Sequence, residues 1–221
     1  MKEYFTLLVE VLPSLLEGLK LTILIAICAL FLATIIGLLF GFASISKNKI
    51  LNKIATIYVG LVRGIPVFVL AYFFYFGICG SIGLKISPFT ASVIVLSINA
   101  SAFLCEIFRG GILAVDFGQM EAARSLGIPY RKSMSHVILP QAIKIMVPSI
   151  MNQFITTLKD TSILSVITVR ELMMNSQIIV ARNFLPFQIY SYTVIFYIVI
   201  VSLLTFVSKK LEKRLNYDSR G

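Results

Sequence analysis

The chain has 221 residues, of which 58% are hydrophobic and 14% are charged. A soluble domain carries about 25% charged residues, so this composition excludes an ordinary soluble protein and predicts one membrane-embedded domain over residues 1–221. The net charge is +10, from 20 Lys and Arg against 10 Asp and Glu. The basic residues lie mostly in short connections between apolar runs, which indicates membrane topology and argues against nucleic acid as a partner.

Five charge-poor stretches are candidates for membrane crossing. A helix needs about 20 residues, at 1.5 Å each, to cross roughly 30 Å of hydrocarbon. The stretches cover residues 21–46, 54–80, 86–105 (continuing towards 111), 145–158 and 183–208. The sequence therefore predicts an all-α integral membrane protein with five transmembrane helices.

The second stretch contains a predicted kink. Gly64 and Pro66 lie near its start, and the proline removes a helical hydrogen bond while the glycine loosens the turn. Arg63 comes just before them. It either anchors at the headgroups or pairs across the bundle with Glu106, and the sequence leaves both alternatives open.

The fourth stretch is short for a crossing. Residues 145–158 would span only about 21 Å, whereas a full crossing from residue 145 would end near residue 164. Lys159 and Asp160 would then lie in the outer part of the membrane. A helix that stops partway is tolerated against protein or a water-filled cavity, which favours a pathway lining; an ordinary short span is the alternative. We expect 165–182 to be a short amphipathic or re-entrant piece before Pro186 opens the last span.

The basic residues also predict orientation. They concentrate after the first, third and fifth stretches: Lys47, Lys49, Lys53, Arg124, Arg131, Lys132, Lys144, Lys209, Lys210, Lys213 and Arg214. The opposite connections hold fewer, and Asp160 and Glu171 lie among them. The positive-inside rule places the N-terminus outside and the C-terminus in the cytoplasm, so that the polar loop at about 113–140 is cytoplasmic.

This loop carries internal signals of structure. Residues 118–126 are predicted to form a short helix, which Gly127 can end by adopting the left-handed conformation. Pro129 permits a second helix over 130–138, and Pro140 predicts another break. Two short helices joined at a glycine make a compact peg, on which Ala122 and Ala123 let a partner surface approach closely. A solvated connecting loop is the alternative.

We expect no catalytic, cofactor-binding or metal-binding residue in this chain. The phosphate-binding pattern Gly-x4-Gly-Lys-Ser/Thr fails after Gly127, because Lys132 stands in place of the second glycine. His136 is the single histidine, and neither a zinc motif nor a Gly-x-Ser-x-Gly nucleophile elbow is present. ATP hydrolysis must therefore be supplied by another chain.

Polar residues at membrane depth are candidates for substrate binding, because ionisable groups there cost several kcal/mol unless they are paired or hydrated. Asn99 and Glu106 are seven residues apart in the third stretch, so they share one helix face. Arg109 follows Glu106 by three residues, and we interpret it as a structural ion-pair partner. The alternative for Asn99 is an interhelical hydrogen bond.

Lys159-Asp160-Thr161-Ser162 is the richest polar cluster. Asp160 offers a carboxylate to an α-amino group or a cationic side chain, and Thr161 and Ser162 can hydrogen-bond a zwitterion. Lys159 points about 100° away on a helix and serves structure or extends outward. The alternative for Asp160 is a helix cap.

Several strings resemble the polar amino acid (histidine/glutamine/arginine) branch of ABC importer permeases. Their cytoplasmic "EAA loop" has the spacing of Glu121-Ala122-Ala123, Gly127 and Leu139-Pro140. Further strings follow the same order: Arg63-Gly-Ile-Pro66, Asn99…Glu106-Ile-Phe-Arg109-Gly-Gly-Ile112 and Leu158-Lys-Asp-Thr-Ser162. The similarity covers residues from about 15 to 210. Ile65, where threonine is commoner, and Val137, at an isoleucine position, depart from the pattern.

The resemblance implies the ABC type I importer architecture, a dimer of five-span permeases in the bacterial inner membrane, identical or paired with a sister chain. It implies two cytoplasmic ATPase subunits, which bind ATP and Mg²⁺, and an extracytoplasmic binding protein that delivers the amino acid. Closure of the ATPase dimer would drive alternating access. By position, coupling to the ATPase is carried over to Glu121, Ala122, Ala123, Gly127, Leu139 and Pro140.

Substrate binding is assigned from polarity and depth alone, to Asn99, Glu106, Asp160, Thr161 and Ser162. Two acids against one nearby lysine favour a cationic amino acid such as arginine, lysine or histidine. The alternative function is a secondary transporter or channel that uses the intramembrane acids without ATP. A membrane-embedded enzyme is disfavoured by the missing catalytic motifs.

Overall fold

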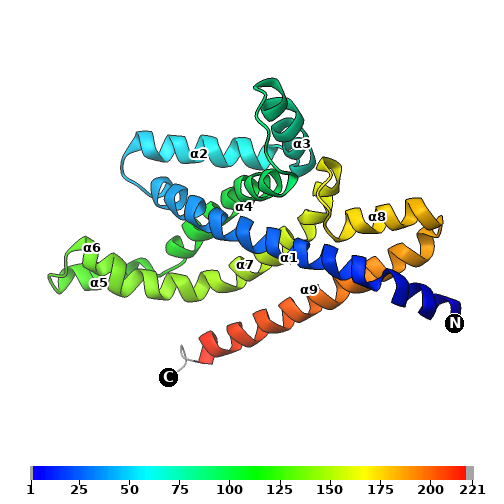
Figure 1. Ribbon diagram of the computed structural model, residues 1–221. Helices are drawn as coiled ribbons and strands as arrows, with labels where there is room; N and C mark the ends of the chain where they lie inside the picture. The colour runs from blue at the N-terminus through cyan, green and yellow to red at the C-terminus, as the bar shows by residue number, and fades with distance from the viewer. Residues whose placement is uncertain (1, 218–221) are drawn as a thin grey trace.

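The computed structural model describes residues 2–217, which form helices and connections without a strand in that range (Figure 1). The α-helices are α1 (Lys2–Ser44), α2 (Lys49–Gly64), α3 (Val67–Tyr72), α4 (Pro88–Leu113), α5 (Phe117–Ser125), α6 (Tyr130–Ser133), α7 (Leu139–Asp160), α8 (Leu172–Asn183) and α9 (Pro186–Tyr217). In Figure 1, α5, α6 and the C-terminal part of α9 lie at one end of the bundle, and the N-terminus and α8 lie at the other. The all-α prediction is confirmed.

The number of spans depends on one bent helix pair. In the described part of the chain, four helical segments are long and apolar enough to cross a membrane: Tyr4–Ser44, Pro88–Leu113, Tyr130–Ile167 and Pro186–Arg214. The pair Lys49–Gly64 and Val67–Cys79 makes a fifth if it counts as one span, although its two arms meet at 99°. The first span begins well before residue 21, where the loss of charged residues had placed it.

The predicted kink in the second span is a complete break. Helix α2 ends at Gly64, Ile65 is extended (φ −102°, ψ 123°), and Pro66 caps α3. The proline ring disfavours the helical conformation in the residue before it, so Ile65 leaves the helix and the chain turns. Beyond α3, Phe73–Cys79 continues as a π-helix.

The predicted break at Pro140 is wrong. The helix is continuous there, because Met134–Ile138 forms a π-helical turn and Pro140 lies in the first turn of α7. A proline inside a helix lacks a donor and its ring crowds the carbonyl four residues earlier; the wider turn accommodates both effects. The fourth span is therefore a long one, with helical residues from 130 to 167, rather than the short stretch of 145–158.

The far end of this span changes character at Asp160. Thr161–Ile167 is a 3₁₀-helix that ends at Thr168 in the left-handed conformation (φ 65°). Helix α8 follows as the expected short piece, and α9 begins at Pro186, as predicted.

Helix α4 is the centre of the bundle, since 72% of its most apolar window is buried. It packs closely on α1 through glycines. A Cβ added at Gly37 would lie 2.8 Å from Leu104 Cβ and 3.1 Å from the Ser101 carbonyl oxygen. Apolar clusters extend this contact to α7 on one side, through Ala142 and Met146. A separate cluster joins the start of α1 to α8 and α9.

Candidate coupling surface and translocation site

The polar loop folds into a hairpin of α5 and α6. Asp116 caps α5, its carboxylate accepting the Gly118 N–H at 2.7 Å. At the other end Gly127 is left-handed (φ 79°), its N–H bonds the Arg124 carbonyl at 3.0 Å, and the Ile128 N–H bonds the Ala123 carbonyl at 3.2 Å. This pair of bonds is a Schellman motif, so the predicted helix and its glycine stop are confirmed.

The predicted coupling residues in the hairpin and at the start of α7 are either packed against the bundle or exposed. Ala123 is 5% exposed and faces the chain, while its neighbours Glu121 and Ala122 are exposed. Gly127 and Pro140 are exposed as well, whereas Leu139 packs against the core. Of the two alanines, only Ala122 is open to a partner.

The hairpin also presents large apolar side chains that the motif reasoning missed. Phe117 is 74% exposed, Leu126 is 80% exposed and Tyr130 is 52% exposed. Such side chains on an otherwise polar loop are typical of a protein interface. The signal in the sequence was their isolation among charged and small residues. Together with Glu121, Ala122 and Gly127 they form what we call the hairpin surface.

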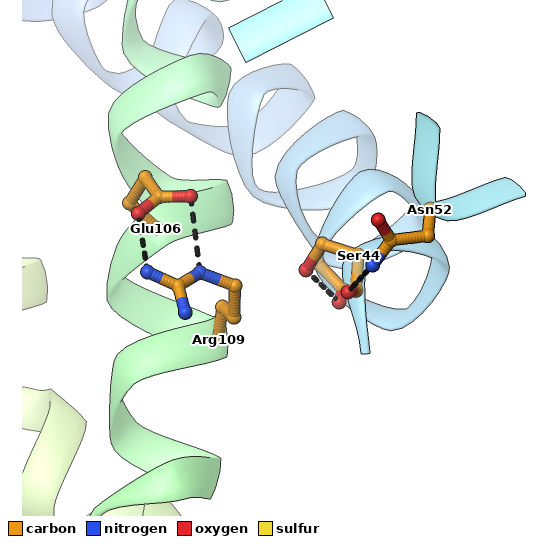
Figure 2. A network of polar contacts seen from close by, with 5 residues as sticks. Ser44, Asn52, Glu106 and Arg109 are labelled. Atoms are coloured by element: carbon orange, nitrogen blue, oxygen red, sulfur yellow. Dashed lines mark hydrogen bonds and ion pairs between the residues drawn. The ribbon is translucent and has the colours of Figure 1, made fainter. Parts of the chain in front are cut away.

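Glu106 is occupied by Arg109, as the spacing predicted. The Arg109 Nε and Nη2 atoms donate to the two carboxylate oxygens of Glu106, at 3.2 and 2.8 Å (Figure 2). This is the one salt bridge among the described residues. Arg63 stacks instead on Phe103, with its guanidinium carbon 5.1 Å from the ring centroid, so it does not form the ion pair with Glu106 that was left open.

The end of α1 is tied to α2 beside this ion pair. Figure 2 shows the Asn52 amide donating to the Ser44 carbonyl, across from Glu106 and Arg109 on α4. Further along, the Tyr58 hydroxyl on α2 bonds the Ser101 hydroxyl on α4 at 2.5 Å. These contacts fix α2 across α1 and α4.

Asn99 is buried in α4 at 8% exposure. In the part of the chain that the structure describes, the Asn99 side chain makes no hydrogen bond to another helix, which was the alternative role for this residue. It shares α4 with Glu106, about two turns away, but the structure does not bring either residue to Asp160.

Asp160 ends α7 and lines a hollow of about 490 Å³ together with Lys159, Ser162, Ile163, Tyr197, Ile198 and Val201. Its carboxylate makes no capping hydrogen bond, contrary to the alternative role as a helix cap. Ser162 is also in the lining, with its hydroxyl donating to the Lys159 carbonyl at 2.8 Å. Thr161 is fully buried and donates to the Leu158 carbonyl at 2.7 Å, so its hydroxyl faces inward.

Glu171, expected only as part of a connection between spans, is a buried acid. It is 0% exposed, and its carboxylate accepts the backbone N–H groups of Met173 at 2.8 Å and Met174 at 2.7 Å. The Tyr197 hydroxyl donates to it at 3.4 Å. Glu171 lies between the spans 130–167 and 186–214. Burial raises its pKa to about 7, and the two N–H donors oppose that rise.

Comparison with known sequences decides the family. The family described as "Binding-protein-dependent transport system inner membrane component" matches residues 33–217. The chain belongs to this family.

Similar members of this transport family include two named permeases. The glutamine transport system permease protein of Escherichia coli (strain K12) is 39% identical over 204 residues, covering 92% of this chain and 93% of its own length. The arginine transport system permease protein of Bacillus subtilis (strain 168) is 35% identical over 211 residues, covering 96% of each.

Solved structures agree with the fold. A chain in the crystal structure of an amino acid ABC transporter with histidines superposes with a TM-score of 0.91 at 35% identity, over 95% of this chain and 98% of that one. A chain of the inward-facing MetNI methionine ABC transporter has a TM-score of 0.77 at 19% identity, over 92% and 97%, and shares the fold.

Membership confirms the predicted architecture and location. The protein is a multi-pass inner-membrane permease component and has the fold of the ABC type I importers. The family is a permease family rather than an ATPase family, and a binding-protein-dependent system implies a partner ATPase and a substrate-binding protein. A secondary transporter, the alternative function, works without either partner and is disfavoured.

Proposed function

We propose that this chain is the permease subunit of an ATP-driven importer for polar amino acids, and that its hairpin surface docks on a separate ATPase subunit. The observation that carries this proposal is the hairpin itself. A loop capped at Asp116 and stopped by a Schellman motif at Gly127 is a fixed protrusion, and it presents exposed Phe117 and Leu126 to a partner. The names of the glutamine and arginine permeases support an amino acid as the substrate.

The six coupling residues, four in the hairpin and two at the start of α7, divide by exposure. Glu121, Ala122, Gly127 and Pro140 are exposed and available for contact. Ala123 and Leu139 face the chain and hold the hairpin on the bundle. We assign contact to the first group and support to the second.

We place the substrate site at the hollow that Asp160 and Ser162 line. Since Arg109 neutralises Glu106, Asp160 remains as the acid that can receive a cationic group. Every amino acid carries an α-ammonium group, and arginine, lysine and histidine add a second cation. We therefore expect cationic amino acids to be preferred over glutamate, with Asn99 and Glu106 further along α4 on the pathway and Thr161 supporting the wall.

The assembly follows from the same reasoning. The partner ATPase binds ATP and Mg²⁺, a second permease (identical or a sister chain) completes the pathway, and an extracytoplasmic protein delivers the substrate. The hairpin and the basic end of α9 lie together at one end of the bundle, opposite the N-terminus, which supports a cytoplasmic hairpin and an outer N-terminus (Figure 1). Closure of the ATPase dimer then switches access between the two sides.

The test is uptake by proteoliposomes that contain the permease, its ATPase and its binding protein. Asp160→Asn should lower arginine uptake at least tenfold while the ATPase still co-purifies, and Glu10→Gln, an exposed acid on α1, should leave uptake unchanged. Uptake that continues without ATP and without the ATPase would refute coupling. Normal uptake by Asp160→Asn would remove Asp160 from the pathway.

A further inference from the structure

Glu171 and Tyr197 join the outer helix α8 to the hollow at Asp160. We infer that Tyr197 is a substrate-contacting wall of that hollow, and that Glu171 is its positioning residue. The buried carboxylate holds the tyrosine hydroxyl and so fixes the ring against the place where a cationic group binds. This inference rests on the proposed function, because it takes the hollow as the substrate site.

The first support is the satisfaction of the Glu171 carboxylate. It is fully buried, and none of the described basic residues pairs with it. One oxygen accepts the Met174 N–H, and the other accepts both the Met173 N–H and the Tyr197 hydroxyl. Each oxygen has one backbone donor from the helix end, and among the described residues the Tyr197 hydroxyl is the side-chain donor to this buried carboxylate. The same side chain therefore caps α8 and holds α9.

The second support is that Glu171 cannot move away from Tyr197. The Leu172 N–H, one residue on, bonds the Thr22 hydroxyl of α1 at 3.2 Å. A Cβ added at Gly18 would lie 2.8 Å from the Leu172 Cα, so α1 and α8 touch through their backbones.

Two more hydrogen bonds hold the rest of α8. The Asn175 amide donates to the Ser14 carbonyl of α1 at 2.8 Å. The Ser176 hydroxyl lies 2.6 Å from the Thr193 hydroxyl of α9, and both are buried. Helix α8 is thus locked to both neighbours, and its capping carboxylate is a fixed point for α9.

The third support is the position of the tyrosine ring. Tyr197 lines the hollow with Asp160 and Ser162, while its hydroxyl lies on the inner side, beside Thr161 and Thr22. The ring therefore forms part of the wall of the hollow, and the hydroxyl holds the side chain in place through its bond to Glu171. An aromatic face attracts an ammonium or guanidinium group. With the Asp160 carboxylate in the same hollow, the two residues provide the complementary charge and surface for one cationic group.

The experiment separates the two roles of Glu171, which are to bond the Tyr197 hydroxyl and to cap α8. Tyr197→Phe removes the hydroxyl alone. Glu171→Asp keeps a good capping carboxylate on α8 but is one methylene shorter, so it loses Tyr197. In ATP-driven arginine uptake by the reconstituted complex, each variant should raise KM about fivefold, the factor expected for one lost hydrogen bond, with kcat within about twofold. The double variant should be no worse than Tyr197→Phe, because Glu171 acts only through the hydroxyl that this variant lacks.

The matched control is Tyr190→Phe, two turns earlier on α9, whose hydroxyl is in none of the described hydrogen bonds and outside the hollow. Its KM should be unchanged. Wild-type KM in Tyr197→Phe and Glu171→Asp, while Asp160→Asn loses uptake, would overturn this inference and leave the substrate site standing. Normal KM in Tyr197→Phe, Glu171→Asp and Asp160→Asn alike would overturn the substrate site as well. Additive effects in the double variant would show that the two residues act separately, which also contradicts the inference.

Discussion

The left-handed Gly127 is the most direct point at which to test the hairpin. We consider Gly127→Ala, with Gly127→Asn as its matched control. Gly127 has φ 79°, and a Cβ built there meets no atom within 4 Å. An alanine therefore clashes with nothing in the chain, and its only penalty is the backbone conformation. Asparagine is larger but tolerates the left-handed region far better than alanine.

The size of the effect follows from that penalty. A left-handed alanine costs about 1–2 kcal/mol, which lowers the population of the native hairpin by up to about 5- to 30-fold. If the ATPase binds only the hairpin closed by the Schellman motif, the apparent Kd rises by the same factor. Asparagine should keep the Kd within about threefold of the wild type.

The assay is a titration of the purified permease in detergent with its ATPase subunit, read as binding and as stimulated ATP hydrolysis. The permease itself should remain folded, because Gly127 is exposed and distant from the core. Equal affinity of the alanine variant and the wild type would refute the link between hairpin geometry and docking. An asparagine variant as weak as the alanine variant would show instead that side-chain volume at the interface matters.

Two further predictions concern stability. Gly37→Ala should destabilise the α1–α4 contact by about 1–3 kcal/mol and lower Tm in detergent, because its Cβ meets Leu104 at 2.8 Å, whereas Gly60→Ala, which meets nothing within 4 Å, should not; equal Tm values would contradict this packing. Glu171 should make stability fall with rising pH. Its pKa is about 7 in the folded protein against 4.5 unperturbed, so its stabilising proton is retained below pH 4.5 and lost as the pH rises through 7. Relative to Glu171→Gln, the wild type should lose about 3 kcal/mol over that range, at 1.36 kcal/mol per pKa unit; parallel melting curves from pH 4.5 to 8 would contradict it.

The backbone preferences of glycine and proline predicted the features that depend only on residues adjacent in sequence. Gly127 as a helix stop and Pro186 as a helix start follow from backbone preferences alone, and both are found. The two prolines at 66 and 140 show the limit of such rules. One breaks the helix by 99° and the other is accommodated by a π-helical turn, and that choice depends on how the following segment packs in the bundle.

The candidate site was predictable in part. The pairing of Glu106 with Arg109 follows from helical spacing and is confirmed. The inward direction of the Thr161 hydroxyl does not follow from helical spacing, because this residue lies where the α-helix becomes a 3₁₀-helix. Glu171 and Tyr197 are 26 residues apart and meet only because α8 folds back between α1 and α9. Contacts of that range depend on tertiary packing, which helical periodicity does not describe.

Helix α1 runs through 43 residues, about 65 Å at 1.5 Å each, which is roughly twice the thickness of the hydrocarbon layer. It touches α8 at Gly18 and α4 at Gly37, so a single rod joins contacts at different depths of the bundle. The charge-free part of α1, residues 21–44, is about 36 Å long at 1.5 Å each and slightly exceeds the hydrocarbon layer, so it responds to a thinner or thicker bilayer by changing its tilt. We therefore expect a change of lipid chain length to act on the Gly18 and Gly37 contacts together.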